Sequence, residues 1–368
     1  MINNERLLQT FLELVQIDSP TGEEEAVSRD VARRLSNVGL NPYIDPYFNI
    51  ITNVPGTANT KPIILNAHLD TVEPGRGIKP IIKDGIIRSS GDTILGGDNK
   101  VGVAAIVETL ITLSEEKFAN NRPIDAVFTV HEESATDGPR LLDYSRLRTS
   151  YGYGFDASRA LGTMVLASPF YNRFDIQVNG KAAHASRPEE AIPVIPVVVE
   201  ALHNLKLGKL DEDSVRNIII TQGGDVRNTI SGNATLKGET RSFIEGKVEQ
   251  YTDEVREAFE AAIKNQNLQD ITFIFEKVRE NGGFKFSDQD PFIQNAARVV
   301  TRLGFPPSFI NSLGCYDANV FAEKGVKIIN FGWGGKFEHT KAEEVSVENL
   351  SGLGNLVYGL ATDLEPID

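Results

Sequence analysis

The chain contains the stretch Ile63-Ile64-Leu65-Asn66-Ala67-His68-Leu69-Asp70, in which an apolar, strand-like run ends in a histidine and a carboxylate. Similar side chains follow other apolar runs or open a helix, at Asp98, Glu132, Glu133, Asp156 and His339. In an open α/β sheet, ligands bind just beyond the carboxyl ends of the strands, so these endings can meet in one crevice. Two imidazoles and several carboxylates in one crevice predict a metal site.

The length of the chain and the order of its patterns predict two domains. At 368 residues the chain exceeds the size at which one hydrophobic core keeps growing. Strand and helix patterns alternate up to Phe155, which predicts a layered α/β sheet. Residues 171–275 read instead as strand, helix, two strands, helix, strand, the ferredoxin-like order. We therefore expect an α/β domain formed by residues 1–169 and 281–368, with a ferredoxin-like α+β domain inserted at 170–280.

Two local patterns add to this outline. Thr21 and Glu24 have the spacing of a capping box before a second amphipathic helix. In the insert, the run from Val194 to Val199 gives a helix a wider apolar face than a small domain needs for its own core. A homodimer contact through the insert is one interpretation of this face.

Charge and composition exclude several classes of partner. The net charge is -14, with 51 acidic against 37 basic residues, which argues against nucleic acid and against an anionic membrane surface. We also expect no secretory leader, since the N-terminal residues read as an amphipathic helix, and no apolar run approaches membrane-spanning length. Cys315 is the single cysteine, which fits a reducing compartment and predicts a cytoplasmic protein.

The stretch around His68 has the geometry of a metal ligand with its orienting partner. Strand side chains alternate, so His68 and Asp70 lie on one face, and Asp70 can accept from the ring nitrogen that does not bind metal. A purely structural histidine is the alternative. Adjacent Glu132 and Glu133 point in opposite directions if extended, so one could hold a metal while the other faces a bound water. Their alternative is a solvated acidic pair.

The remaining candidates have equally plain alternatives. Asp98 follows two glycines at the start of a helix, where it could be an N-cap or a carboxylate that bridges two cations. His339 lies in a polar loop, where most histidines are only solvated. His184 belongs to the insert, so it can join the metal site only if domains or subunits close on each other.

Several ordered motifs together make the chain recognisable. They comprise Ile17-Asp18-Ser19-Pro20-Thr21-Gly22-Glu23, Asn66 to Val72, Leu95-Gly96-Gly97-Asp98-Asn99-Lys100, Glu132-Glu133, Gly180 to Ser186, and Cys315-Tyr316-Asp317-Ala318-Asn319. With them the chain resembles, over essentially its full length, the metallopeptidase family of peptidase T, carboxypeptidase G, aminoacylases and succinyl-diaminopimelate desuccinylase. The nearest resemblance is to the tripeptidase branch around peptidase T.

The resemblance implies a role for each candidate in the main domain. Asp98 would bridge two zinc ions, with His68 and Asp156 completing one site and Glu133 and His339 the other. Asp70 would orient His68, and Glu132 would be the general base. The Asp98–Asn99 peptide bond would be cis. Because carboxylates and histidines also accept cobalt or manganese, the ligand set does not choose among these metals.

In the insert, the resemblance implies that His184 donates to the oxyanion, often in the partner subunit's active site. Asn228 and Arg241 would hold the substrate carboxylate. The expected activity is that of a dizinc exopeptidase acting on short peptides, as a tripeptide aminopeptidase. A carboxypeptidase or N-acyl amino acid amidohydrolase using the same site is the alternative within the hydrolases, and a non-catalytic binding relative is the alternative outside them.

Overall fold

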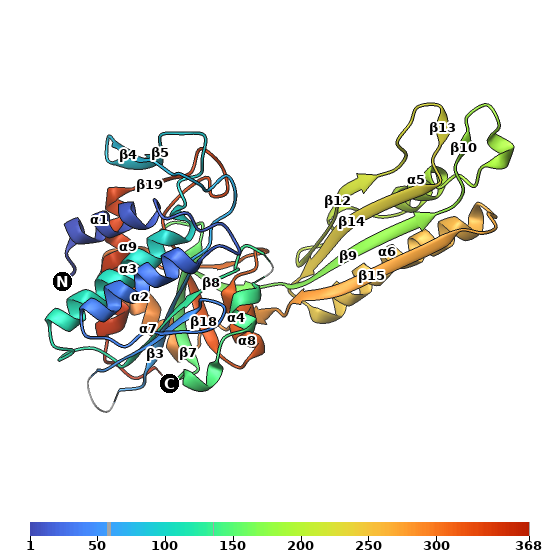
Figure 1. Ribbon diagram of the computed structural model, residues 1–368. Helices are drawn as coiled ribbons and strands as arrows, with labels where there is room; N and C mark the ends of the chain where they lie inside the picture. The colour runs from blue at the N-terminus through green and yellow to red at the C-terminus, as the bar shows by residue number, and fades with distance from the viewer. Residues whose placement is uncertain (57–59, 135, 368) are drawn as a thin grey trace. The chain divides into compact units, whose positions relative to one another are not determined.

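The computed structural model describes residues 1–56, 60–134 and 136–367. The chain divides into two compact units (Figure 1). The first unit consists of Met1–Ala167, Lys285–Ser312 and Tyr316–Asp368, and the second of Ser168–Phe284 and Leu313–Cys315.

A nine-stranded sheet forms the centre of the first unit. Its order is β1 (Tyr43–Ile44), β2 (Ile50–Val54), β6 (Ile124–Thr129), β3 (Ile63–His68), β7 (Tyr151–Ala157), β18 (Lys327–Gly332), β8 (Thr163–Ser168) and β16 (Phe284–Lys285), while β17 (Ser308–Asn311) also pairs with β8. The four central strands, β6, β3, β7 and β18, are parallel to one another. Every residue of β3 and β6 is buried, as in sheets covered on both faces. Their carboxyl ends therefore share one edge.

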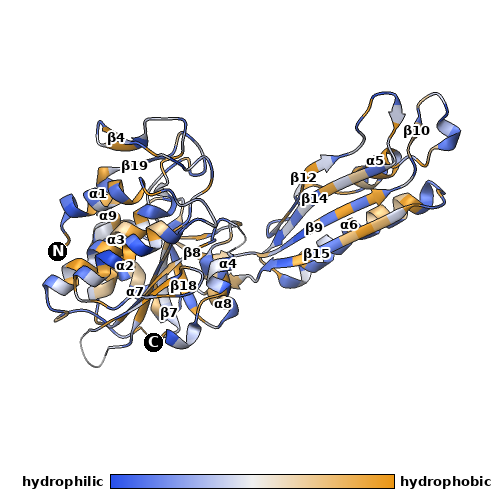
Figure 2. Ribbon diagram, in the orientation of Figure 1, coloured by the Kyte–Doolittle hydropathy of each residue, from blue (hydrophilic) through white to orange (hydrophobic). Residues whose placement is uncertain are grey.

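Helices pack around this sheet. They are α1 (Asn4–Leu14), α2 (Glu25–Asn37), α3 (Gly97–Glu115), α4 (Asp137–Arg140), α7 (Pro291–Arg302), α8 (Asp317–Glu323) and α9 (Val347–Thr362), with the short 3-10 helix η1 (Tyr144–Arg146). Helix α3 is buried along most of its length and contacts α1, α9 and β3. Helix α2 instead mixes hydrophilic and hydrophobic residues, as Figure 2 shows, and buries one face. The predicted α/β class is confirmed.

The predicted capping box before α2 is wrong. The helix begins at Glu25 after Glu24, and among the described residues the side chain of Glu24 makes no capping hydrogen bond. Thr21 donates its hydroxyl hydrogen to Asp70 instead, with 2.8 Å between Oγ1 and Oδ2. Glu24 accepts from the backbone of Gly22 and of His131. Thr21 thus bonds to the distant Asp70, and Glu24 bonds to the distant His131 as well as to Gly22, so the two side chains do not form the reciprocal local cap.

A small three-stranded sheet, which the sequence patterns do not predict, connects distant loops of the first unit. Its order is β19 (Glu344–Ser346), β5 (Ile86–Ser89) and β4 (Pro80–Lys83). Strand β19 follows the polar loop that contains His339 and pairs antiparallel with β5. The loop after β18 is therefore attached at its far end to a segment that precedes α3.

The second unit has its own antiparallel sheet and core. Its strand order is β11 (Gly208–Lys209), β12 (Ser214–Gln222), β14 (Asn233–Ser242), β9 (Phe170–Asn179) and β15 (Thr272–Asn281), and its helices are α5 (Ile195–His203) and α6 (Glu245–Asn265). A two-stranded ribbon of β10 (Ala183–His184) and β13 (Thr229–Ile230) and the 3-10 helix η2 (Pro188–Glu190) complete it. Phe174 and Ile176 of β9 pack in one core with Phe259 of α6. Strand, helix, two strands, helix, strand is the ferredoxin-like order.

No helix in the part of the chain that the structure describes combines the length and apolarity needed to cross a membrane.

Candidate metal centre

The shared edge of the parallel strands brings the predicted side chains of the first unit together. Strand β3 ends at His68, β7 carries Asp156, and β6 is followed closely by Glu132. Within each of three groups, possible ligand atoms lie within 4.8 Å of one another: His68, Asp98 and Asp156; His68, Glu132 and Glu133; and Asp98, Glu133 and His339. Six side chains from five separate stretches of the sequence thus form one cluster.

Asp98 lies between the two histidines of this cluster. Its Oδ1 is 3.1 Å from Nε2 of His68, and its Oδ2 is 3.5 Å from Nε2 of His339. Each oxygen of the carboxylate therefore faces a different imidazole. The peptide bond from Asp98 to Asn99 is cis, as the resemblance implied.

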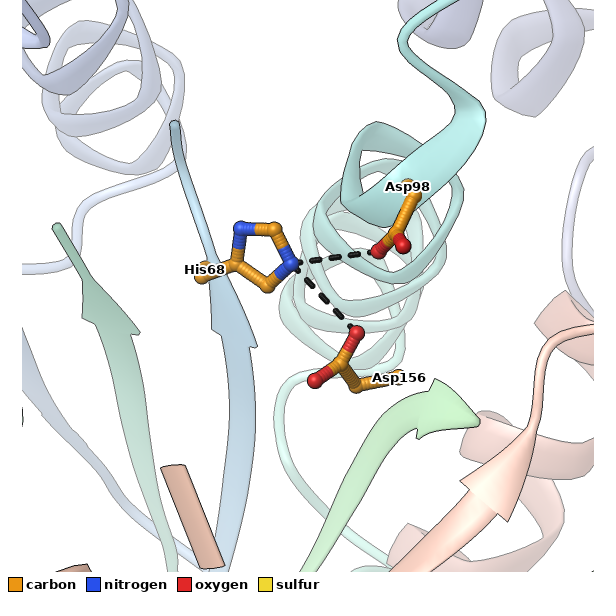
Figure 3. Close-up of side chains that lie close together, drawn as sticks. All are labelled: His68, Asp98 and Asp156. Atoms are coloured by element: carbon orange, nitrogen blue, oxygen red, sulfur yellow. Dashed lines mark hydrogen bonds and ion pairs between the residues drawn. The ribbon is translucent and has the colours of Figure 1, made fainter. Parts of the chain in front are cut away.

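A second carboxylate accompanies each histidine. Oδ1 of Asp156 is 3.4 Å from Nε2 of His68, and Figure 3 shows that Asp98 and Asp156 approach this same ring nitrogen. Oε1 of Glu133 is 3.0 Å from Nε2 of His339. The site thus consists of two imidazole and carboxylate groups that share Asp98.

Asp70 supports both His68 and the Glu132–Glu133 turn. Its Oδ1 lies 3.4 Å from Nδ1 of His68, on the side of the ring away from Asp98. The same carboxylate accepts backbone N–H bonds from Glu132 at 3.0 Å and from Glu133 at 3.1 Å. One buried side chain can therefore fix the ring and the two glutamates together.

The charges of the cluster are strongly coupled. Burial, followed by the charge of Asp156, raises the pKa of Glu132 well above its usual range. Burial and the charge of Asp98 likewise raise the pKa of Asp156. Hydrogen bonds that the His339 ring donates to the carboxylates of Asp98 and Glu133 raise the pKa of His339 to about 11. Carboxylates this close together repel one another when ionised, and positive charge between them would offset that repulsion.

This donor set fits two divalent cations. Imidazole nitrogens with carboxylate oxygens suit zinc, cobalt and manganese, and none of the clustered ligands is a thiolate. A carboxylate whose oxygens face different histidines can serve two ions at once. Cations between these groups would also offset the repulsion among the carboxylates, which adds to burial in raising the pKa values of Glu132 and Asp156.

Three predicted site residues belong to the second unit. His184, on β10, is exposed, and its Nδ1 is 2.7 Å from Oγ of Ser186. The carbonyl oxygen of Asn228 accepts from the backbone of Ala185 at 2.8 Å.

Arg241 is already engaged within the second unit. Its Nη2 donates to Glu239 at 3.0 Å and its Nη1 to the Leu313 carbonyl at 2.9 Å, while its guanidinium lies 4.4 Å from the ring centre of Tyr171. Its Nε is buried and has no hydrogen-bond partner among the described residues.

Sequence reasoning missed two charged side chains behind the cluster. The Lys100 ammonium is buried and donates to Oγ of Ser19 at 2.7 Å and to the Leu69 carbonyl at 2.6 Å. Burial lowers its pKa to about 8. The buried carboxylate of Glu343 accepts backbone N–H bonds from the turn that carries Asp98. In the sequence, the only sign of a role was that Lys100 lies close to Asp98 and Glu343 lies close to His339. Charged residues at such positions ordinarily face solvent, so this sign is weak.

Three comparisons with known proteins agree on one class. Residues 64–363 match the family model described as Peptidase family M20/M25/M40. The crystal structure of aminopeptidase PepT from Bacillus cereus is 33% identical, has a TM-score of 0.89, and each chain is covered to 98%. A tripeptidase from Staphylococcus aureus is 31% identical with a TM-score of 0.93, again with 98% of each chain covered. Carboxypeptidase G2 from Pseudomonas is 27% identical over 64% of this chain and 59% of its own length.

Proposed function

The chain belongs to peptidase family M20/M25/M40, and we propose that it is a metal-dependent exopeptidase that removes the N-terminal residue of tripeptides. The observation that carries this proposal is the placing of Asp98, whose two oxygens face His68 and His339. The similarity to an aminopeptidase and a tripeptidase over 98% of both chains supports the choice of substrate.

Two metal ions would be held by the side chains around Asp98. His68, Asp98 and Asp156 would bind one ion, and Asp98, Glu133 and His339 the other. Zinc is our first choice, with cobalt and manganese as alternatives that the same ligands accept. When bound, such ions supply Lewis acidity, which activates water and polarises the scissile carbonyl.

Glu132 would move the proton in this reaction. It would accept the proton of the attacking water and return it to the nitrogen of the leaving amine. Its position supports the role, because possible ligand atoms of Glu132, His68 and Glu133 lie within 4.8 Å of one another, and a general base must be within reach of the water that it deprotonates. Asp70, which accepts from the backbone of both glutamates, would keep Glu132 in place.

We assign the second unit, residues 170–280 in the predicted boundaries, to substrate binding and to a homodimer contact. The backbone N–H of Ser186 donates to Nδ1 of His184. In a neutral ring this leaves the proton on Nε2, where it could be donated to an oxyanion. Asn228 and Arg241 would bind the substrate carboxylate, in the partner subunit's active site or in their own. Val199 of α5 is 61% exposed, and such apolar residues support the contact.

The cytoplasm is the compartment that we propose, because a chain with a single cysteine forms no internal disulfide.

Hydrolysis of a tripeptide by the zinc-loaded protein tests the proposed activity. We expect release of the first residue from the free tripeptide and from its C-amidated form, and no cleavage of the N-acetylated form. Mass spectrometry of the products identifies the residue released. The carboxypeptidase or acylase alternative would be supported if the acetylated peptide is cleaved and the C-amidated peptide is not. The similarity to carboxypeptidase G2 is the reason to test this alternative.

Replacing Arg241 with methionine tests the proposed carboxylate contact. Hydrogen bonds to a charged group contribute about 1.5–3 kcal/mol, so kcat/KM for the free tripeptide should fall about 10- to 100-fold. The value for the C-amidated tripeptide should change far less, because it lacks the charge. Arg256→Met, on the exposed side of α6, is the control. Equal losses for both substrates would show that Arg241 acts only through its contacts with Glu239, Leu313 and Tyr171 within the second unit.

A further inference from the structure

The carboxylate of Glu343 is buried against the turn that leads into α3 (Gly97–Glu115). Its Oε2 accepts backbone N–H bonds from Leu95 at 2.9 Å and from Gly96 at 2.8 Å, and its Oε1 accepts from Asp98 at 2.9 Å. The residue is only 1% exposed. Successive N–H groups that converge on one anion form a nest, and here the anion belongs to the protein itself.

We infer that Glu343 is a positioning residue that holds Asp98 between the two proposed metal sites. The inference rests on the proposed function, since it assumes that Asp98 binds metal. Glu343 accepts a hydrogen bond from the backbone N–H of Asp98, while the carboxylate of Asp98 faces His68 and His339. The nest also satisfies a buried charge that would otherwise be costly.

Little room is left for this turn to move. Gly96 has a φ of 71°, in the left-handed region that favours glycine. A Cβ atom added to Gly97 would lie 3.0 Å from Oε1 of Glu343 and 3.3 Å from the ring of Trp333. The turn is therefore packed directly on the carboxylate, and displacement of one displaces the other.

Glu343 also connects Asp98 with the loop that carries His339. The ends of this loop are joined by two backbone hydrogen bonds of 3.0 Å between Lys336 and Glu344. Within it, the N–H of Glu343 donates to the Thr340 carbonyl at 3.1 Å. One loop thus presents an imidazole to the side chain of Asp98 and a carboxylate to its backbone.

This arrangement predicts an unequal effect on the two sites. In the group of Asp98, Glu133 and His339, two members depend on the loop. In the group of His68, Asp98 and Asp156, only Asp98 does. Partners outside the coordination sphere typically change metal affinity about 10- to 100-fold. Loss of the hydrogen bonds to Glu343 should therefore lower the affinity for the ion at His339 by that amount, and the affinity for the ion at His68 much less.

The test is Glu343→Gln, whose amide keeps the size of the side chain but puts N–H hydrogens against a donor nest. Stepwise zinc affinities are measured by competition with a chromophoric chelator, and the visible spectrum of the cobalt-loaded protein reports the geometry of each ion. We expect one ion to bind about 10- to 100-fold more weakly and the other to change less than about threefold. Glu344→Gln, the neighbouring carboxylate that pairs with Arg88, is the matched control.

A His339→Ala background identifies which ion is affected. With the ligand at that site removed, adding Glu343→Gln should leave the remaining ion unchanged. Gly97→Ala pushes the turn away from Glu343 and should weaken the same ion, so it decides the question if Glu343→Gln does not fold.

Unchanged affinities in Glu343→Gln, or equal weakening of both ions, would overturn the inference while leaving the proposed function intact. A wild-type protein that fails to bind two ions would overturn both.

Discussion

Replacing Glu132 with alanine is expected to lower kcat for the tripeptide by about 10²- to 10⁴-fold, the usual contribution of a general base. Both metal ions should remain bound. The groups formed by His68, Asp98 and Asp156 and by Asp98, Glu133 and His339 are complete without Glu132. Steady-state kinetics and the metal content of the dialysed protein, measured together, check the two halves of this prediction.

The control for Glu132 lies at the start of α4, shortly after this residue. Asp137→Ala removes an exposed carboxylate five residues further along the chain and should alter neither kcat nor metal content. Wild-type turnover in the Glu132 variant would remove this residue as the base. Loss of an ion from it would instead make Glu132 a ligand, as its place in the group with His68 and Glu133 would allow.

The site could be predicted largely because parallel strands simplify the geometry. Apolar runs that end in His68, in Asp156 and before Glu132 indicated the shared edge, since neighbouring parallel strands place their carboxyl ends together. The roles of Asp98 and His339 came only from the family resemblance. Asp70, two residues after the end of β3, also lies on the predicted side of His68, with 3.4 Å between its Oδ1 and Nδ1 of the ring. Backbone pattern determines such contacts, and backbone pattern is visible in the sequence.

Contacts made by loops were not predictable in the same way. Thr21 and Glu24 have capping-box spacing, yet each side chain bonds to a residue that only the folded sheet brings near. Lys100 and Glu343 look like solvated charges in the sequence. Glu343 bonds to an N–H group that is 245 residues away. The partner of such a side chain depends on the paths of two loops. The small β4–β5–β19 sheet holds one of them, the loop that contains His339, and its short strands show no clear pattern in the sequence.

Replacing Asp98 with alanine should have the largest effect of all, because this carboxylate belongs to both metal groups. Its loss leaves only His68 with Asp156 at one site and Glu133 with His339 at the other. Even partners outside the coordination sphere are worth about 10- to 100-fold in affinity, so losing a shared ligand should weaken both ions by more than about 100-fold. Without the Lewis acidity, worth several kcal/mol, turnover should fall by about 10³-fold or more.

The comparison with other variants makes the Asp98 result specific. Glu132→Ala should keep both affinities, Glu343→Gln should weaken one about 10- to 100-fold, and Asp98→Ala should weaken both by more than about 100-fold, each measured by the same chelator competition. Asp92→Ala, an exposed carboxylate shortly before the Gly-Gly turn, should keep both ions and full activity. The metal-free Asp98 variant should unfold at nearly the temperature of the metal-free wild type, since Glu343 accepts from the backbone of residue 98 whatever its side chain. One ion bound at wild-type affinity in Asp98→Ala would show that this carboxylate serves a single metal and does not bridge two.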